Sequence, residues 1–174
     1  RGAPRLAALL SRRGALEDAV VEATAKALRD APSNGDVLVF LPGAREIRRV
    51  ASALRERTDV NIETLYGAMP AEAQDAVVLG RRGRRVVVAS PIAEASLTLE
   101  GVTAGVDSGL RRVATIDEDT GLRRLTTRAV SRASADQRTG RAGRTAPGLC
   151  LRIFPEAEYE SLSEFSAPEI MSAD

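Results

Sequence analysis

Short apolar runs alternate along this chain with longer segments that are apolar on one side only. Residues 37–41 read VLVFL, and residues 84–90 contain the run VVVA. A strand that is buried on both faces has such a continuous apolar sequence. Between the two runs, residues 44–57 place apolar side chains at i, i+3, i+4 and i+7, the spacing of a helix with one buried face. The alternation predicts an α/β fold with a largely parallel sheet.

The same patterns predict the remaining elements. We expect further helices at 15–30 and 70–80, and further strands at 60–67, 102–110 and 148–154. Residues 111–128 interrupt the alternation, because two strand-like arms flank turn residues at 118–121. This segment predicts an inserted β-hairpin. The chain is expected to enter a helix in the glycine- and arginine-rich segment that follows.

Composition excludes several classes of chemistry. The 174 residues contain no histidine, which excludes histidine-based acid–base catalysis and most zinc sites. Cys150 is the only cysteine, so no disulfide forms within the chain, which fits a reducing, cytoplasmic location. No apolar run reaches about 18 residues, so we expect no membrane-spanning helix. The net charge is only +1, and any surface that binds a polyanion must therefore concentrate its positive charge locally.

Positive charge is concentrated in residues 137–148, QRTGRAGRTAPG. Arg138, Arg141 and Arg144 follow one another at three-residue spacing, with glycines between them and no acidic residue. On a helix, arginines three apart fall within one broad face, and glycines let a phosphate chain come close. Guanidinium groups are planar and permanently charged, and they donate hydrogen bonds to phosphate groups. The segment is therefore a candidate phosphate site, with a solvated arginine face as the plain alternative.

Five segments in chain order resemble motifs of superfamily 2 helicases, in the form typical of the DEAH-box family. They are VLVFLPGAREI (37–47) for motif IV, LYGAMP (65–70) for motif IVa, ASPIAEASLTLEGV (89–102) for motif V, VDSGL (106–110) for the segment after it, and QRTGRAGR (137–144) for motif VI. The sequence around motif VI is similar to the bacterial HrpB-type branch of the family. The resemblance spans about residues 35 to 160.

This resemblance implies a RecA-like three-layer sandwich with an inserted β-hairpin. Residues 15–160 would form the second RecA-like domain of an ATP-dependent RNA helicase. Residues 1–14 would lead into that domain, and residues 161–174 would begin the connection to a further C-terminal domain. The implied partners are RNA and the other domains of the same chain. ATP and Mg²⁺ would be bound mainly by the first RecA-like domain.

The resemblance also implies roles for individual residues. Arg141 and Arg144 would be arginine fingers against the triphosphate, and Gln137 would help to place the attacking water. Thr98 and Glu100 occupy positions that contact the ribose of the nucleotide. The residues implied in RNA binding are Ser90, Tyr66, Gly67, Arg111, Arg112, Arg123 and Arg124.

Several positions depart from the family pattern, and at one of them Ala95 replaces a frequent threonine. Pro91 replaces the usual asparagine of motif V, which removes a side-chain amide and a backbone donor. Val77 or Val78 stands where relatives often have an aromatic residue that stacks on the adenine. We therefore expect little base stacking from this domain.

Missing motifs limit what the chain does alone. Lys26, the only lysine, does not lie in a glycine-rich GK[ST] loop, and the family's Asp-Glu pair with histidine is absent. The isolated chain is expected to be inactive as an ATPase. Two alternatives are a nucleic-acid-binding α/β module without ATP chemistry and a complete small α/β enzyme. The helicase reading expects Arg141 and Arg144 to line a surface at the carboxyl ends of the strands, where open α/β sheets bind ligands.

Overall fold

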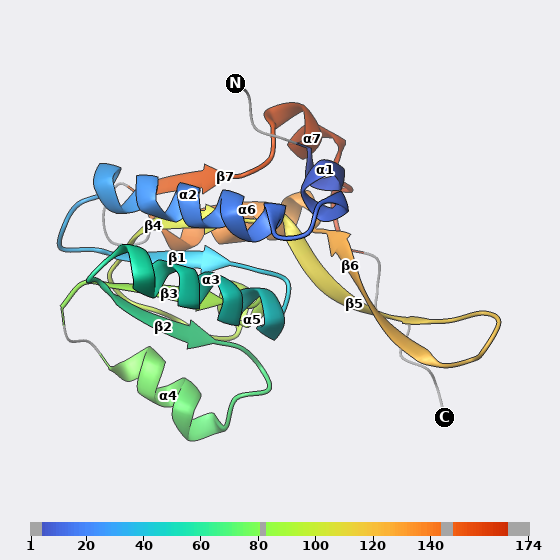
Figure 1. Ribbon diagram of the computed structural model, residues 1–174, viewed down its shortest axis with the longest axis horizontal. Coiled ribbons are helices and arrows are strands. Elements are labelled where there is room, and N and C mark those ends of the chain that lie inside the picture. Colours follow the sequence, from blue (N-terminus) through green and yellow to red (C-terminus); the bar gives the residue numbers. More distant parts are fainter. Residues whose placement is uncertain (1–4, 81–82, 144–147, 167–174) are drawn as a thin grey trace.

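The computed structural model describes residues 5–80, 83–143 and 148–166 (Figure 1). Its centre is a five-stranded parallel sheet with the strand order β2-β3-β1-β4-β7. These strands are β1 (Asp36–Phe40), β2 (Asn61–Leu65), β3 (Arg85–Ala89), β4 (Val102–Asp107) and β7 (Leu149–Arg152). The helices are α1 (Leu6–Ser11), α2 (Ala15–Asp30), α3 (Ala44–Arg57), α4 (Ala71–Leu79), α5 (Ile92–Ala95), α6 (Arg132–Arg141) and α7 (Glu156–Ser161).

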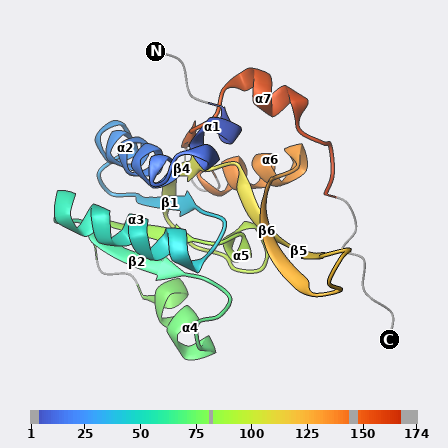
Figure 2. The ribbon, with the colours of Figure 1, turned by 45° about the vertical axis from the view of Figure 1, so that its right-hand side comes forward.

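The two faces of the sheet carry separate apolar clusters, because successive residues of a strand point to opposite faces. Val37 and Val39 of β1 join the cluster under α2 and α3, whereas Leu38 and Phe40 join the cluster on the side of α4 and α5. Figure 2 shows α2 and α3 side by side along the sheet. The structure thus confirms the predicted three-layer α/β sandwich with a parallel sheet.

A two-stranded antiparallel hairpin projects from this body (Figure 1). Its strands are β5 (Leu110–Ile116) and β6 (Arg123–Ala129), so the inserted hairpin predicted at 111–128 is confirmed. At the tip, Asp117 Oδ1 accepts hydrogen bonds from the backbone N–H groups of Asp119 and Thr120. At the base, the Val130 N–H donates to the Gly109 carbonyl oxygen at 2.9 Å. Both ends of the hairpin are therefore fixed by hydrogen bonds.

Two predicted boundaries differ most from the structure. The strand predicted at 102–110 ends at Asp107, because the chain turns at Gly109, which has a φ of 72°. A side chain at this glycine would meet the ring of Phe154 at 2.5 Å. The helix expected to begin within 137–144 begins instead at Arg132, because the Ser131 hydroxyl accepts a hydrogen bond from the Ser134 N–H and caps the helix there.

A buried arginine ties the strands together at the amino edge of the sheet. Arg85 of β3 is 1% exposed, and its Nε donates to Asp36 Oδ2 at 3.0 Å. Its Nη1 donates to Glu63 Oε2 of β2 at 2.8 Å and to the backbone carbonyls of Val77 and Gly80. One side chain therefore joins β1, β2, β3 and the carboxyl end of α4.

No helix among the described residues is long and apolar enough to cross a membrane.

Candidate nucleotide and nucleic-acid interface

The first arginine of the 138–144 cluster is buried and fully engaged by the protein. The side chain of Arg138 is 0% exposed. Its Nε donates to Glu94 Oε1 at 2.6 Å, and its Nη1 donates to Asp107 Oδ1 at 2.7 Å. Its Nη2 donates to the Leu110 carbonyl oxygen at 3.1 Å, and the guanidinium lies 5.1 Å from the centre of the Phe40 ring. The acidic partners that the local sequence lacks come from other segments, so Arg138 does not share an open face with the other arginines.

Gln137 and Arg141 lie one turn apart on the same flank of α6, by helical spacing. Gln137 is exposed and Arg141 is partly buried. Ser134, which lies on the same flank by helical spacing, donates from its hydroxyl to Glu94 Oε1 of α5 at 2.7 Å. Arg144 lies outside the described residues. The helix that carries the first two catalytic candidates packs against β4 and against α5 of motif V.

Motif V runs from the end of β3 through α5 to β4. Thr98 and Glu100 are exposed, and Leu99 between them is buried in the same apolar cluster as Ala142 of motif VI. One apolar cluster thus contains Leu99 of motif V and Ala142 of motif VI. Thr98, Glu100 and Arg141 are the chain neighbours of these two residues.

Ser90 lies at the carboxyl end of β3 and is half-buried. Its backbone N–H donates to the Leu65 carbonyl oxygen at 2.9 Å, which ties motif V to the end of β2. Pro91 then stands at the N-cap of α5, where a helix needs no backbone donor. The departure from the family pattern at this position therefore costs no helical hydrogen bond.

Tyr66 and Gly67 form the turn after β2, at the same edge as Ser90. Tyr66 is half-buried against the apolar core and Gly67 is exposed. The side-chain amide of Gln74 donates to the carbonyl oxygens of Tyr66 and Gly67 at 3.3 Å and of Met69 at 3.1 Å. Sequence reasoning missed Gln74, because a single glutamine in the first turns of a helix carries no signal of this contact. Three bonds from one amide fix the shape of the turn.

Packed apolar side chains occupy the adenine-stacking position. Val77 is 9% exposed and belongs to the apolar cluster, and Val78 packs against that cluster. Neither side chain offers a flat surface to a base.

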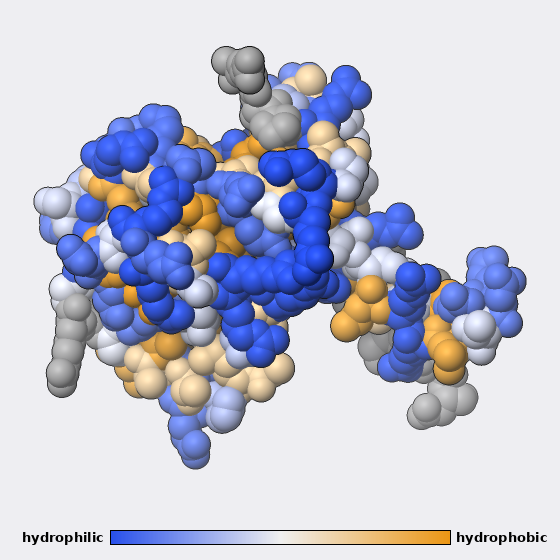
Figure 3. Space-filling model, in the orientation of Figure 1, coloured by the Kyte–Doolittle hydropathy of each residue, from blue (hydrophilic) through white to orange (hydrophobic). Residues whose placement is uncertain are grey.

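The hairpin separates its arginines onto two faces. Residues opposite each other in an antiparallel pair point to the same side. Arg111 pairs with Arg128 and Thr115 pairs with Arg124, whereas Ala114 pairs with Leu125 and Ile116 pairs with Arg123. One face is therefore rich in arginine and threonine, and the other is largely apolar. Figure 3 shows apolar surface beside hydrophilic surface on the projecting hairpin.

The predicted RNA-binding role is weakened for one hairpin arginine. Arg112 lies on the apolar face, and its Nη2 donates to Glu46 Oε1 of α3 at 2.9 Å. Glu46 is largely buried, so the pair is partly shielded from solvent. The charge of Arg112 is compensated within the protein, which separates it from Arg111, its neighbour in sequence.

Cys150 of β7 lies beside α6, and its Sγ is 3.5 Å from the Thr139 hydroxyl. Burial raises the pKa of the Cys150 thiol above its ordinary value. A thiol of this kind is a packing residue rather than a nucleophile.

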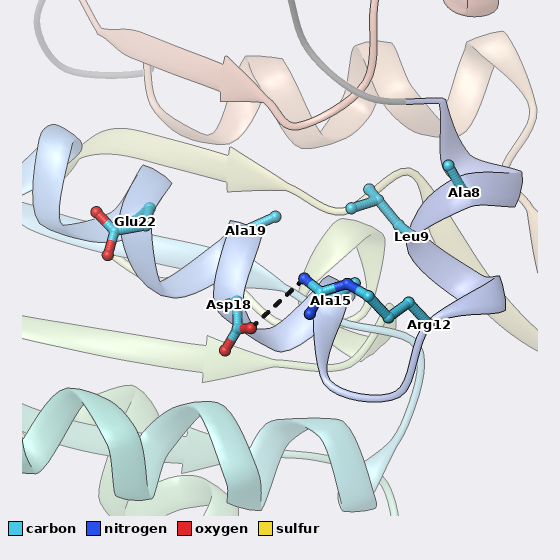
Figure 4. A pocket seen from close by; sticks show the side chains of 7 residues that line it. All are labelled: Ala8, Leu9, Arg12, Ala15, Asp18, Ala19 and Glu22. Carbon is cyan, nitrogen blue, oxygen red and sulfur yellow. Dashed lines mark ion pairs between the residues drawn. The ribbon is translucent and has the colours of Figure 1, made fainter.

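The hollow drawn in Figure 4 is lined by residues that precede these motifs in the chain. It has a volume of about 410 Å³ and lies between α1 and α2. Its lining residues are Ala8, Leu9, Arg12, Ala15, Asp18, Ala19 and Glu22. Arg12 and Asp18 form an exposed ion pair there at 3.8 Å. None of the residues predicted to bind ATP or RNA lines it, so it is not the candidate site.

The described part of the chain contains no group of three or more acidic, histidine or cysteine side chains that could hold a metal ion. A glycine-rich phosphate loop is also missing from the sequence.

The fold and the packed motifs V and VI define the C-terminal motor domain of a helicase. Residues 19–146 match the family described as helicase conserved C-terminal domain, and the chain belongs to this family. It is 45% identical over 162 residues to the ATP-dependent RNA helicase HrpB of Escherichia coli, covering 91% of this chain and 20% of that protein. It is 39% identical to the ATP-dependent RNA helicase HrpA of the same organism, covering 80% of this chain and 11% of that protein.

The comparison with solved structures agrees. The crystal structure of E. coli DExH-box NTPase HrpB superposes with a TM-score of 0.82 at 44% sequence identity, over 91% of this chain and 20% of that one. The chain therefore spans about a fifth of the length of its HrpB relative. The resemblance to the DEAH-box, HrpB-type branch is confirmed.

Proposed function

We propose that this chain is the second motor domain of an ATP-dependent RNA helicase and supplies one wall of an ATP site. The observation that carries the proposal is the common position of Gln137 and Arg141 on the flank of α6 that faces motif V. The phosphate loop and the carboxylates that hold Mg²⁺ would lie in a first RecA-like domain, since the described residues offer no such site.

Each candidate then has a chemical task. Arg141, together with Arg144, donates to the charge that develops on the γ-phosphate during transfer, an effect worth about 10³–10⁵ in rate in other NTPases. Gln137 orients the attacking water. Thr98 and Glu100 are exposed on the same side of the sheet and contact the ribose.

The RNA track follows the carboxyl edge of the sheet and continues onto the hairpin. Ser90 and the turn at Tyr66 and Gly67 contact the sugar–phosphate backbone at this edge. On the hairpin, the track uses the arginine-rich face, and Arg111 and Arg124 belong to it. These contacts are electrostatic and do not read sequence.

The alternative is a nucleic-acid-binding module without ATP chemistry. It accounts for the hairpin arginines equally well. It gives no reason for Gln137 to share a flank with Arg141 beside the exposed residues of motif V.

The test uses the full-length protein and measures ATP hydrolysis with and without RNA. Arg141→Ala should lower turnover by about 10³-fold or more, while RNA affinity changes little, because the guanidinium acts mainly in the transition state. Arg48→Ala is the matched control, since Arg48 is an exposed arginine on α3, outside the proposed site. A loss of RNA binding in Arg141→Ala equal to its loss of turnover would support the module without ATP chemistry.

A further inference from the structure

One carboxylate oxygen joins motif V to motif VI. Glu94 Oε1 of α5 accepts from Ser134 Oγ at 2.7 Å and from Arg138 Nε at 2.6 Å. Ser134 and Arg138 are successive residues on one stripe of α6. Glu94 is 14% exposed, so water competes little for this oxygen. The contact fixes α5 against α6 at two points.

The same guanidinium also anchors α6 to the sheet through a different nitrogen. Arg138 Nη1 donates to Asp107 Oδ1 at the end of β4, and this carboxylate is 1% exposed. Asp107 Oδ1 also accepts from the Gly109 N–H at 2.8 Å. Arg138 therefore makes two separable connections, one to the sheet through Asp107 and one to α5 through Glu94.

The two connections of Arg138 join residues that lie close in the chain to the proposed RNA contact and to the catalytic candidates. Ser90, the proposed RNA contact, directly precedes the first turn of α5, and its carbonyl oxygen accepts from the Ala93 N–H at 3.2 Å. Within that turn, the Glu94 N–H donates to the Pro91 carbonyl oxygen at 2.9 Å, so a shift at Ser90 carries Glu94 with it. Arg138 directly follows Gln137 and lies three residues before Arg141.

We propose that Arg138 is a positioning residue, which couples RNA engagement at motif V to the placement of Gln137 and Arg141 through its bond to Glu94. The proposal rests on the proposed function. Arg138 is buried and touches neither substrate. Its role is to make α5 and the catalytic flank of α6 move as one body, because an ion pair with so little solvent access is costly to break.

The experiment breaks the bond to α5 and leaves the bond to the sheet. Glu94→Met in the full-length protein removes the acceptor while Arg138 keeps Asp107. We expect the stimulation of kcat by RNA to fall about tenfold or more, within the range typical of coupling between two sites. The KM for ATP and the Kd for single-stranded RNA should stay close to those of the wild type, whereas the unfolding temperature should fall because a largely buried ion pair is broken. Glu94→Gln retains a carbonyl acceptor and should recover part of the stimulation.

Glu63→Met is the matched control, because Glu63 pairs with the buried Arg85 at 2.8 Å at the opposite edge of the sheet. It should leave the stimulation by RNA at the wild-type value. Two results would overturn the coupling: wild-type stimulation in Glu94→Met, or a joint loss of stimulation and of ATP affinity in that variant. Wild-type turnover in Arg141→Ala would instead refute the proposed function, and the coupling with it.

Discussion

Removing the buried arginine at the amino edge of the sheet should destabilise this domain strongly. Arg85→Met keeps a long, flexible side chain but removes every hydrogen bond of the guanidinium. Asp36, which is 2% exposed, would lose its charged partner, and the carbonyls of Val77 and Gly80 would lose their donor. Only Glu63, at 26% exposure, has solvent to replace the contact.

Most of the expected loss of stability comes from Asp36, whose carboxylate would stay buried without a charged partner. Breaking a buried ion pair by removing one partner costs about 3–5 kcal/mol. The lost bonds to the carbonyls of Val77 and Gly80 would add to this cost. For a domain of this size, each kcal/mol lowers the unfolding temperature by roughly 2–4 °C. The expected decrease is therefore about 6–20 °C.

Thermal unfolding of the 174-residue chain, followed by circular dichroism, measures this decrease. Arg49→Met is the control, because Arg49 pairs with Glu17 at 3.4 Å on the surface, with 41% of its side chain exposed. A surface pair of this kind contributes about 0–1 kcal/mol, so the control should shift the transition by no more than roughly 4 °C. Equal shifts in the two variants would refute the assignment of Arg85 as a buried tie between strands.

Four further outcomes are expected. The isolated chain should not hydrolyse ATP, and turnover above the blank or micromolar nucleotide affinity in a titration would contradict its assignment as half of a motor. In the full-length protein, Arg128→Gln should weaken RNA binding and reduce the steepness of the plot of log K against log salt concentration by about 0.7. Arg112→Gln should change that slope little, because Arg112 is paired with Glu46. Equal slopes in the two variants would contradict the distinction between the two hairpin faces. Replacing residues 117–121 with a short glycine-containing turn should reduce duplex unwinding while RNA-stimulated ATP hydrolysis persists, and a parallel loss of both activities would count against a separating role for the hairpin. Cys150 should react with iodoacetamide more slowly in the folded chain than in denaturant at pH 8, because burial raises its pKa and lowers the thiolate fraction; identical rates would show that the thiol is not shielded.

The sequence predicts the elements well because their signals are local. The apolar run at 37–41 and the amphipathic pattern at 44–57 each lie within one element, and β1 and α3 are found there. The hairpin is also local, since turn residues separate two adjacent arms. The boundary errors arise where a single residue sets the end of an element. Gly109 is an example, because the chain turns at its positive φ although the apolar pattern would continue the strand.

The partners of the charged residues are not predictable in this way, because they come from distant segments. Arg138 is 44 residues from Glu94 and 31 residues from Asp107. Arg112 is 66 residues from Glu46. A window around motif VI shows three similar arginines, and only the fold shows that the first is buried. Gln137, Thr98 and Glu100 are exposed, and the roles that the motif predicts for them stay predictions.

Two arginines, Arg85 and Arg138, are buried in the described part of the chain. Buried ion pairs contribute little net stability compared with apolar residues of similar size, so stability alone does not favour Arg85 and Arg138. A guanidinium differs from an apolar side chain because its N–H groups form hydrogen bonds only in fixed directions. Arg85 sets the relative positions of three strands and the end of α4, and Arg138 sets those of α5, α6 and β4. If the domain responds to RNA and ATP through motifs V and VI, the position of α5 relative to α6 matters more than a few kcal/mol of stability. The variants Glu94→Met and Glu63→Met separate these two contributions, because both break a contact to a buried arginine and only the first lies between the motifs.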